Sequence, residues 1–365
     1  MMIVKFLFYL YSIFNLFLLN IYLFLKKIFS KKKVIFFYHP KENLTKIHSY
    51  YMEDFLFKFD KYEIIFGSKI LILRYFYIKE SLLPYIYNID IFLSNNVCNN
   101  FTHHSKRVYF HHDIYDTPLV EKKKEKELKK RLTKYDFVFL ASKKSKYIFE
   151  KIFSNLKKKP KLLYLGYYPK LNYLLNKNLV RKKINRNIII APTNFNGFPK
   201  LTMQPYLETL IKNLLKIDYK IIYRPHPSNV KEKKVLALEK NFKNFKNFKL
   251  DTSSNYFNSY SSSNFMITDI SGTAYTYAFF TKNPVFFFSP NEKRIKNSYY
   301  KNLSYFNDRN KIGKVFLKDK LMIAFFLKNK NNIFKKKIKK NILDIYKKNF
   351  NNLDYNIFMK LYDNK

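Results

Sequence analysis

The stretch Asn264-Phe-Met-Ile-Thr-Asp-Ile-Ser-Gly-Thr273 passes from an apolar run into a short polar loop. Phe265 to Ile267 is continuously apolar, which is typical of a strand covered on both faces in a parallel sheet. An apolar run of helical length follows, from Ala274 to about Phe280. Ligands of open parallel sheets bind beyond the carboxyl ends of the strands, and a helix start offers unpaired amides to an anion. The stretch therefore predicts a βα unit whose loop, Ser271 to Thr273, binds an anion.

Two earlier stretches have the same organisation, Asn187-Ile-Ile-Ile-Ala-Pro-Thr193 and Lys220-Ile-Ile-Tyr-Arg-Pro-His-Pro-Ser228. Arg224 carries a planar fork of donors that matches phosphate oxygens, and His226 adds a further donor. The two prolines of the second stretch fix their own φ and restrict the residues before them, so its loop is held extended. Together the three stretches indicate a phosphate-bearing ligand.

Short apolar runs recur along the whole chain with helix-length spacers, which predicts an α/β fold with parallel strands. The expected strands are 34–38, 62–66, 90–93, 107–110, 135–140, 161–165, 187–191, 220–223, 265–267 and 284–288. A chain of 365 residues exceeds one ordinary domain. The polar, basic stretch 176–186 is the best linker between two domains. We expect α/β domains over 31–178 and 179–345, preceded by a membrane anchor or interfacial helix over 1–30 and followed by a closing helix or tail over 346–365.

The N-terminal run from Phe6 to Leu25 is long enough to cross a bilayer. The run contains three polar residues and is preceded by a lysine; they are Ser12, Asn15, Asn20 and Lys5. On a helix these four residues lie within an arc of about 140°. A helix lying in the membrane interface therefore remains an alternative to a span. Five lysines between residues 26 and 33 favour the cytoplasmic side. We expect a peripheral or single-pass protein on the cytoplasmic face of the cell membrane.

The chain has 70 Lys and Arg against 26 Asp and Glu, a formal net charge of +44. Codon bias accounts for the composition as well as function does, but either way the charge attracts the protein to anionic lipid surfaces. The single Cys98 excludes an internal disulfide and a site with several cysteine ligands. The chain lacks a clustered carboxylate motif at the expected strand ends, and its two His-His pairs lack a ligand spacing. We expect metal-independent chemistry with no cofactor.

The motifs, in this order and spacing, resemble those of the CDP-glycerol glycerophosphotransferase family, the polymerases and primases of teichoic-acid-like polymers. The resemblance rests on the segments 165–169, 189–193, 224–227 (Arg-Pro-His-Pro), 268–273 (Thr-Asp-Ile-Ser-Gly-Thr) and 284–288. The chain departs from the family at Tyr109-Phe-His-His-Asp113, where relatives usually show Trp-His-Gly-Thr, and at Ser271-Gly272, where many show Ser-Ser. The equivalent histidine is therefore His111 or His112.

The resemblance implies a GT-B-like pair of Rossmann-like domains, with a CDP-linked donor bound mainly by the C-terminal domain and a glycan or lipid-linked acceptor by the N-terminal one. It implies transfer of glycerol phosphate or a related polyol phosphate to a cell-surface polymer precursor, with CMP as leaving group. A histidine near pKa 6.5 suits the abstraction of a hydroxyl proton. The implied catalytic residues are His111 or His112 with Asp113; the phosphate-binding residues are Arg224, His226, Ser271, Gly272 and Thr273; and the residues that bind nucleotide or polyol, or hold the loops, are Thr193, Thr268 and Asp269.

Two other functions remain open at this point. An inverting GT-B glycosyltransferase would use the same fold with a nucleotide sugar, and the loop from Tyr109 to Leu119 would decide between them. A non-catalytic binder of RNA or another polyanion would explain the charge and the many aromatic residues. The basic residues are dispersed along the chain, however, so we expect no specific nucleic-acid partner.

Overall fold

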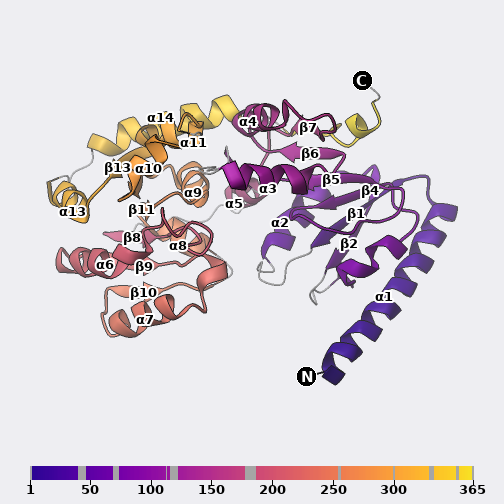
Figure 1. Cartoon of the computed structure of the whole chain (residues 1–365), viewed down its shortest axis with the longest axis horizontal. Helices are drawn as coiled ribbons and strands as arrows, with labels where there is room; N and C mark the ends of the chain where they lie inside the picture. Colours follow the sequence, from indigo (N-terminus) through magenta and orange to yellow (C-terminus); the bar gives the residue numbers. More distant parts are fainter. Residues whose placement is uncertain are drawn as a thin grey trace. The chain divides into compact units, whose positions relative to one another are not determined.

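The computed structural model describes residues 2–39, 47–68, 74–111, 113–115, 122–176, 186–253, 256–298, 301–328, 333–350 and 353–363. The chain divides into two compact units (Figure 1). Unit 1 contains Met1–His112, Glu125–Pro169 and Asn352–Lys365, and unit 2 contains Asp113–Lys124 and Lys170–Asn351. The domain boundary expected at 178 falls on residues outside the described ranges, so that boundary and the one at 345 stay predictions.

Unit 1 is built on a seven-stranded sheet of order β3-β2-β1-β4-β5-β6-β7, in which all neighbouring strands are parallel. Its strands are β1 (Lys33–His39), β2 (Tyr62–Ser68), β3 (Phe76–Tyr77), β4 (Ile91–Ser94), β5 (Lys106–Phe110), β6 (Phe137–Leu140) and β7 (Lys161–Tyr164). The helices before and between them are α1 (Met2–Phe29), α2 (Ile47–Leu56), η1 (Glu80–Tyr85), α3 (Lys122–Leu132) and α4 (Lys143–Phe153).

Unit 2 contains a six-stranded sheet of order β10-β9-β8-β11-β12-β13, again wholly parallel. Its strands are β8 (Asn187–Ile190), β9 (Lys220–Tyr223), β10 (Phe248–Leu250), β11 (Phe265–Thr268), β12 (Val285–Phe288) and β13 (Gly313–Phe316). Its helices are α5 (Pro169–Asn176), η2 (Gln204–Tyr206), α6 (Leu207–Lys216), η3 (Pro227–Asn229), α7 (Lys233–Phe242), α8 (Phe257–Ser262), α9 (Thr273–Thr281), α10 (Glu292–Lys296), α11 (Ser304–Asn307), α12 (Arg309–Ile312), α13 (Asp319–Lys328) and α14 (Ile333–Asn349).

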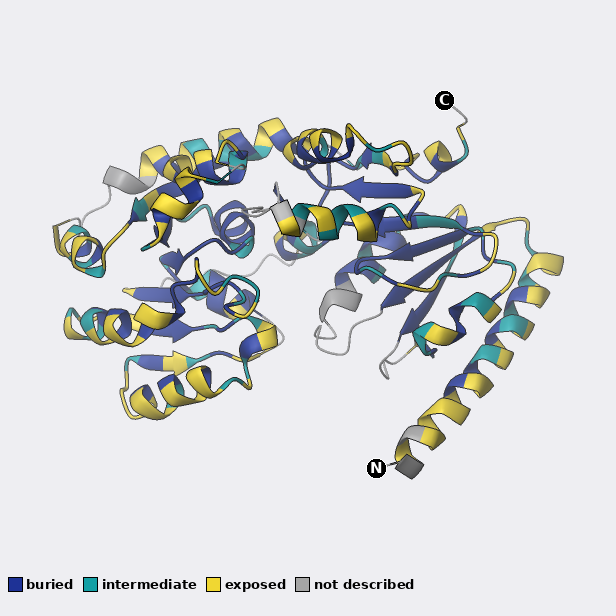
Figure 2. Cartoon of the chain, viewed as in Figure 1, coloured by how far each residue is buried: buried dark blue, intermediate teal, exposed yellow. Residues whose placement is uncertain are grey.

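The strand order of unit 2 reverses between β8 and β11. From β8 the chain moves outward to β9 and β10, and from β11 it moves the other way to β12 and β13. At such a switch point the two central loops diverge to opposite faces and leave a crevice that binds ligands. The central strands are buried, as the dark blue arrows of Figure 2 show. The predicted α/β class with parallel sheets is confirmed, and the switch point lies at the loops that follow Ile190 and Thr268.

Helix α1 lies along unit 1 and uses its polar residues to bind it (Figure 1). Ser12 Oγ accepts from the amide of Lys79 at 2.8 Å, and Asn20 Nδ2 donates to the carbonyl of Tyr85 at 2.9 Å. Leu19 and Leu23 are fully buried in the core of unit 1. By length and composition Phe6–Phe29 could cross a membrane, and 22% of its most apolar window is buried. Ser12 and Asn20, two residues of the polar arc noted in the sequence, therefore face protein.

The C-terminal region serves both units. Helix α14 packs on α9 and α12 of unit 2, and Tyr346 and Phe350 contact the ring of Phe279. The segment after it belongs to unit 1, where the ring of Phe358 lies 4.8 Å from that of Phe59. Helix α14 carries many basic residues, but its buried side makes ordinary core contacts, for example at the fully buried Ile342.

Candidate active site

A buried carboxylate links the two central loops at the switch point of unit 2. Asp269, directly after β11, accepts from the backbone amides of Thr193 at 2.8 Å, Met203 at 2.9 Å and Ile270 at 2.7 Å. Thr268 Oγ1 donates to the carbonyl of Ala191 at 2.6 Å. Burial raises the pKa of Asp269 to about 6, although its amide donors act in the opposite direction. Thr193, Thr268 and Asp269 thus fasten the loops after β8 and β11 to each other.

Arg224, directly after β9, is held in one orientation by three groups. Its Nη1 donates to Asp251 Oδ2 at 2.7 Å and its Nη2 to the carbonyl of Ser253 at 2.8 Å. The guanidinium lies 5.5 Å from the ring centroid of Tyr256. Burial raises the pKa of Asp251, but hydrogen bonds from Ser253 and Ser259 and the charge of Arg224 outweigh it and hold that pKa below its usual value. Asp251 is thus an ionised partner for Arg224.

His226 caps the short helix η3 with its ring. Its Nδ1 accepts from the amide of Ser228 at 3.2 Å. A neutral imidazole that accepts at one nitrogen carries its proton on the other, so this contact assigns the proton to Nε2. The ring can therefore donate a hydrogen bond from Nε2 without changing its charge. His226 is partly exposed.

The first turn of α9 has no side-chain cap. Gly272 is its N-cap residue and makes no side-chain hydrogen bond. The hydroxyl of Thr273 is hydrogen-bonded to that of Tyr260, and the carbonyl of Ser271 accepts from Tyr305 Oη at 2.8 Å. An uncapped helix start carries partial positive charge and favours an anion. Ser271, Gly272 and Thr273 therefore form the predicted anion-binding turn, which aromatic hydroxyls hold in place.

The segment after His112 belongs to unit 2 and brings a carboxylate to this turn. A Cβ placed on Gly272 would lie 3.2 Å from Asp113 Oδ1, so the absence of a side chain at 272 lets Asp113 approach. Tyr115 anchors the segment, because its ring stacks on that of Tyr275 at 4.3 Å and its hydroxyl donates to Asp308. Asp113 is thus a neighbour of the anion-binding turn.

A lysine that sequence reasoning did not select lies in the same cluster. Lys170, in the first turn of α5, has its Nζ 4.3 Å from the ring centroid of Tyr256. Burial lowers its pKa to about 7, the charge of Arg224 adds to this, and Asp113 opposes it. Lys170, Arg224, Tyr256 and Asp113 therefore share one electrostatic environment.

The two candidate bases differ in what the structure describes of them. His111 is 2% exposed in unit 1, and its ring lies 4.7 Å from that of Phe149. Its amide donates to the carbonyl of Phe139. His112 lies outside the described residues. His111 thus occupies a core position, away from solvent.

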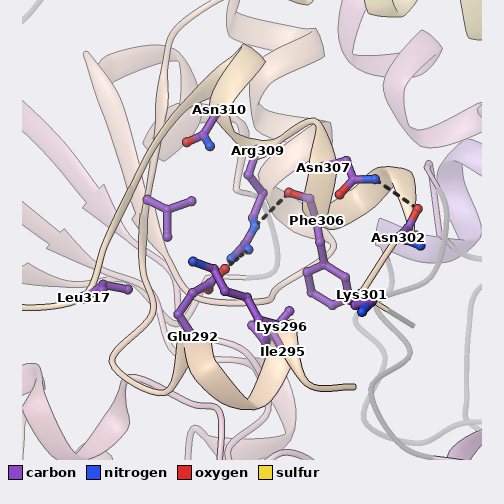
Figure 3. A pocket seen from close by; sticks show the side chains of 11 residues that line it. Glu292, Ile295, Lys296, Lys301, Asn302, Phe306, Asn307, Arg309, Asn310 and Leu317 are labelled. Atoms are coloured by element: carbon purple, nitrogen blue, oxygen red, sulfur yellow. Dashed lines mark hydrogen bonds and ion pairs between the residues drawn. The ribbon is translucent and has the colours of Figure 1, made fainter. Parts of the chain in front are cut away.

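A cavity of about 630 Å³ lies elsewhere in unit 2, beside α10, α11, α12 and β13 (Figure 3). At its side Arg309 donates to Glu292 at 2.5 and 3.1 Å, and both side chains are buried. None of the residues expected to bind phosphate lines this cavity. Its size alone does not make it the active site, and the convergent donors lie at the strand ends instead. Among the described residues, no group of three His, Cys, Asp or Glu side chains could hold a metal ion.

A family model described as CDP-Glycerol:Poly(glycerophosphate) glycerophosphotransferase matches residues 96–337, which include every residue of this site. The chain belongs to this family. It is a transferase that moves glycerol phosphate from CDP-glycerol, as the motif order predicted. No curated protein sequence matches the chain significantly.

Solved structures share the fold at low sequence identity. The wall teichoic acid polymerase TagF matches with 17% identity and a TM-score of 0.57, covering 87% of this chain and 84% of that one. A TagF variant with CDPG gives 20% identity and a TM-score of 0.58, with 94% and 92% covered. MnaA of S. aureus with UDP gives 14% identity and a TM-score of 0.60, with 86% and 92% covered. These likenesses confirm the predicted GT-B-like α/β fold.

Four residues of the site escaped prediction from sequence, namely Lys170, Asp251, Tyr256 and Tyr260. Asp251 follows a three-residue strand that the apolar pattern did not reveal. Its only sequence signal was its place before a Ser-rich stretch. Lys170 directly follows the segment 165–169, on which the family resemblance partly rests. Among 70 basic residues, however, the sequence does not show which one is partly buried.

Proposed function

We propose that unit 2 binds the diphosphate of CDP-glycerol in the crevice after β8, β9 and β11. The observation that carries this is the fixed orientation of Arg224 by Asp251 and Ser253. An arginine has five N–H donors, and two of them are used within the described residues. The remaining donors can pair with phosphate oxygens, and His226 Nε2 and the first turn of α9 supply further donors.

In this proposal catalysis is electrostatic at the donor and acid–base at the acceptor. As the acceptor hydroxyl attacks the β-phosphorus, the bond from that phosphorus to the bridging oxygen breaks and CMP leaves. Negative charge grows on the leaving phosphate, where Arg224 and His226 stabilise it. Ser271, Gly272 and Thr273 hold the phosphates through hydroxyl and amide donors. Asp269 acts on substrate only indirectly, by holding the crevice together.

We propose His112 as the general base. A base must come within hydrogen-bond reach of the acceptor hydroxyl, and the burial of His111 against Phe149 works against that role. Asp113, the next residue in the chain, lies against Gly272 at the anion-binding turn. A carboxylate in this position can orient the imidazole and stabilise its protonated form.

We further propose that the protein binds the cytoplasmic face of the membrane peripherally through α1. The polar residues of the helix are engaged with unit 1. Its other side exposes large apolar residues, among them Phe14, Phe17 and Phe24. A helix with one side fixed to a protein and the other apolar suits an interfacial position, and the adjoining lysines add attraction to anionic lipids. The acceptor would then be a glycan or lipid-linked precursor at that surface.

The test of the transferase mechanism is CMP release from CDP-glycerol, with CDP-ribitol and nucleotide sugars as competing donors. We expect turnover with a CDP-polyol, a loss of 10²- to 10⁴-fold in His112→Ala and a much smaller loss in His111→Ala. Lys212→Ala, at an exposed position of α6, is the matched surface control. Turnover with a nucleotide sugar alone would move the protein to the glycosyltransferases, and a greater loss in His111→Ala would reverse the assignment of the base.

The test of the membrane proposal is sedimentation with vesicles that contain anionic lipid. Phe14→Ser with Phe17→Ser removes exposed apolar area without touching the polar contacts of α1, so we expect weaker vesicle binding at an unchanged melting temperature. Protease protection of both termini distinguishes a peripheral helix from a membrane span. A protected N-terminus in sealed vesicles would indicate a span and refute the peripheral arrangement.

A further inference from the structure

Lys170 and Arg224 share an aromatic partner. The Lys170 Nζ lies 4.3 Å and the Arg224 guanidinium carbon 5.5 Å from the ring centroid of Tyr256. The Tyr256 side chain is buried, and its hydroxyl has no hydrogen-bond partner among the described residues. Two cations and a buried hydroxyl donor therefore meet around one ring, directly beside the crevice.

The two cations are not equally neutralised. Arg224 has an ion pair with Asp251. Within the part of the chain that the structure describes, no carboxylate lies within ion-pair distance of Lys170, and Asp113 reaches it only as a more distant charge. Lys170 is partly buried, and an ammonium taken partly out of water without a paired acid is destabilised. A bound anion would remove that cost.

We propose that Lys170 is a binding residue for the diphosphate of the donor. The inference rests on the donor site proposed above and adds a ligand to it. The charge-assisted hydrogen bond from an ammonium to a phosphate oxygen is among the stronger polar contacts in proteins. Burial and the charge of Arg224 lower the pKa of Lys170, and the negative charge of a bound diphosphate acts in the opposite direction.

The charged and titratable groups around Lys170 come from three places. Arg224 approaches from the end of β9, Asp113 from the segment that precedes α3, and Tyr256 from the start of α8. Burial lowers the pKa of Lys170 to about 7 with Arg224 as second cause. Binding of the diphosphate near neutral pH should therefore take up a fraction of a proton at Lys170.

The experiment is calorimetric titration of the full-length protein with CDP-glycerol at pH 7, in buffers of different ionisation enthalpy. CDP-glycerol is a suitable probe because its diphosphate is a diester without a group that titrates near pH 7. The wild type should take up a measurable fraction of a proton. Lys170→Met should take up markedly less and bind about 10- to 100-fold more weakly. Lys170→Arg, which is always charged, should restore much of the affinity without the proton. Lys212→Met is the surface control.

The outcomes separate this inference from the proposed function. Unchanged proton uptake and affinity in Lys170→Met, with normal CMP release in the wild type, would overturn the role of Lys170 and leave the function standing. Binding of a nucleotide sugar in place of CDP-glycerol, still with proton uptake that depends on Lys170, would overturn the donor and support Lys170. The melting temperatures of both variants show whether they fold, and failure of Lys170→Arg to restore affinity in a folded protein would also refute the inference.

Discussion

Asp269 offers a quantitative test because burial and hydrogen bonding act on its carboxyl in opposite directions. The side chain is fully buried and accepts from three backbone amides. Burial prevails and raises the pKa from 3.8 to about 6. At 1.36 kcal/mol per pKa unit, that interval corresponds to about 3 kcal/mol.

The direction in which the free energy of unfolding changes with pH follows from proton linkage. The pKa of Asp269 is higher in the folded than in the unfolded state, so between about pH 4 and pH 6 the folded protein binds more protons. The free energy of unfolding therefore falls as the pH rises through this window, and above it the ionised carboxylate costs the folded state the full amount. Asp269→Asn does not titrate. The difference in unfolding free energy, wild type minus Asp269→Asn, should fall by about 2.4 kcal/mol between pH 4 and pH 7.

The assay is urea unfolding of both proteins in the same detergent at several pH values. Other titrating groups cancel in the difference. A constant offset of about 1–3 kcal/mol is expected as well, because the amide group of Asn would face the N–H of Met203 and leave it without an acceptor. Asp60→Asn, at an exposed carboxylate, is the matched control. A difference that stays constant or rises with pH would show that the amide donors outweigh burial, and it would refute the reasoning.

Three further substitutions test contacts of the site. Gly272→Ala should reduce CMP release several-fold at a nearly unchanged melting temperature, because its Cβ would press on Asp113 Oδ1 at 3.2 Å; full activity would exclude a role for that approach. Tyr115→Phe leaves the buried Asp308 with one donor fewer and should cost about 1 kcal/mol in urea unfolding; no loss would exclude the anchoring role. Asp251→Asn removes the ionic partner of the donor-site arginine and should raise the KM for CDP-glycerol about 10-fold with less effect on kcat; an effect confined to kcat would contradict it.

Parallel strands were predictable because buried strands in such a sheet are apolar on both faces. Phe265 to Ile267 and Asn187 to Ala191 were identified this way, and the structure places both at the centre of the unit 2 sheet. Short or partly polar strands carry too few residues for the pattern to register. β3 has two residues and β10 three. The loss of β10 concealed Asp251, whose position after that strand makes it the partner of Arg224.

Residue chemistry predicted which groups could bind phosphate but not their partners. From sequence, Asp269 was open to binding nucleotide or polyol or to holding the loops. The structure gives it the amide of its neighbour Ile270 and two amides of the loop after β8, those of Thr193 and Met203. Contacts of this kind depend on which loops the switch point brings together, and no local pattern around position 269 records them. Likewise, the polar arc of α1 indicates an interfacial helix from sequence alone, and the structure shows that Ser12 and Asn20 hydrogen-bond to the backbone of unit 1.

The net charge of +44 does not say which cations bind the ligand. Most lysines of this chain are solvated, and a solvated lysine beside a phosphate contributes a screened attraction that salt removes. Lys170 differs because burial, the repulsion of Arg224 and the absence of a paired acid among the described residues all weaken its charge before the ligand arrives. An anion that binds there gains both the hydrogen bond and the relief of that repulsion. Surface charge can therefore concentrate anionic partners near the protein. In the proposed site, the selection of a diphosphate depends on the few cations that the fold partly buries.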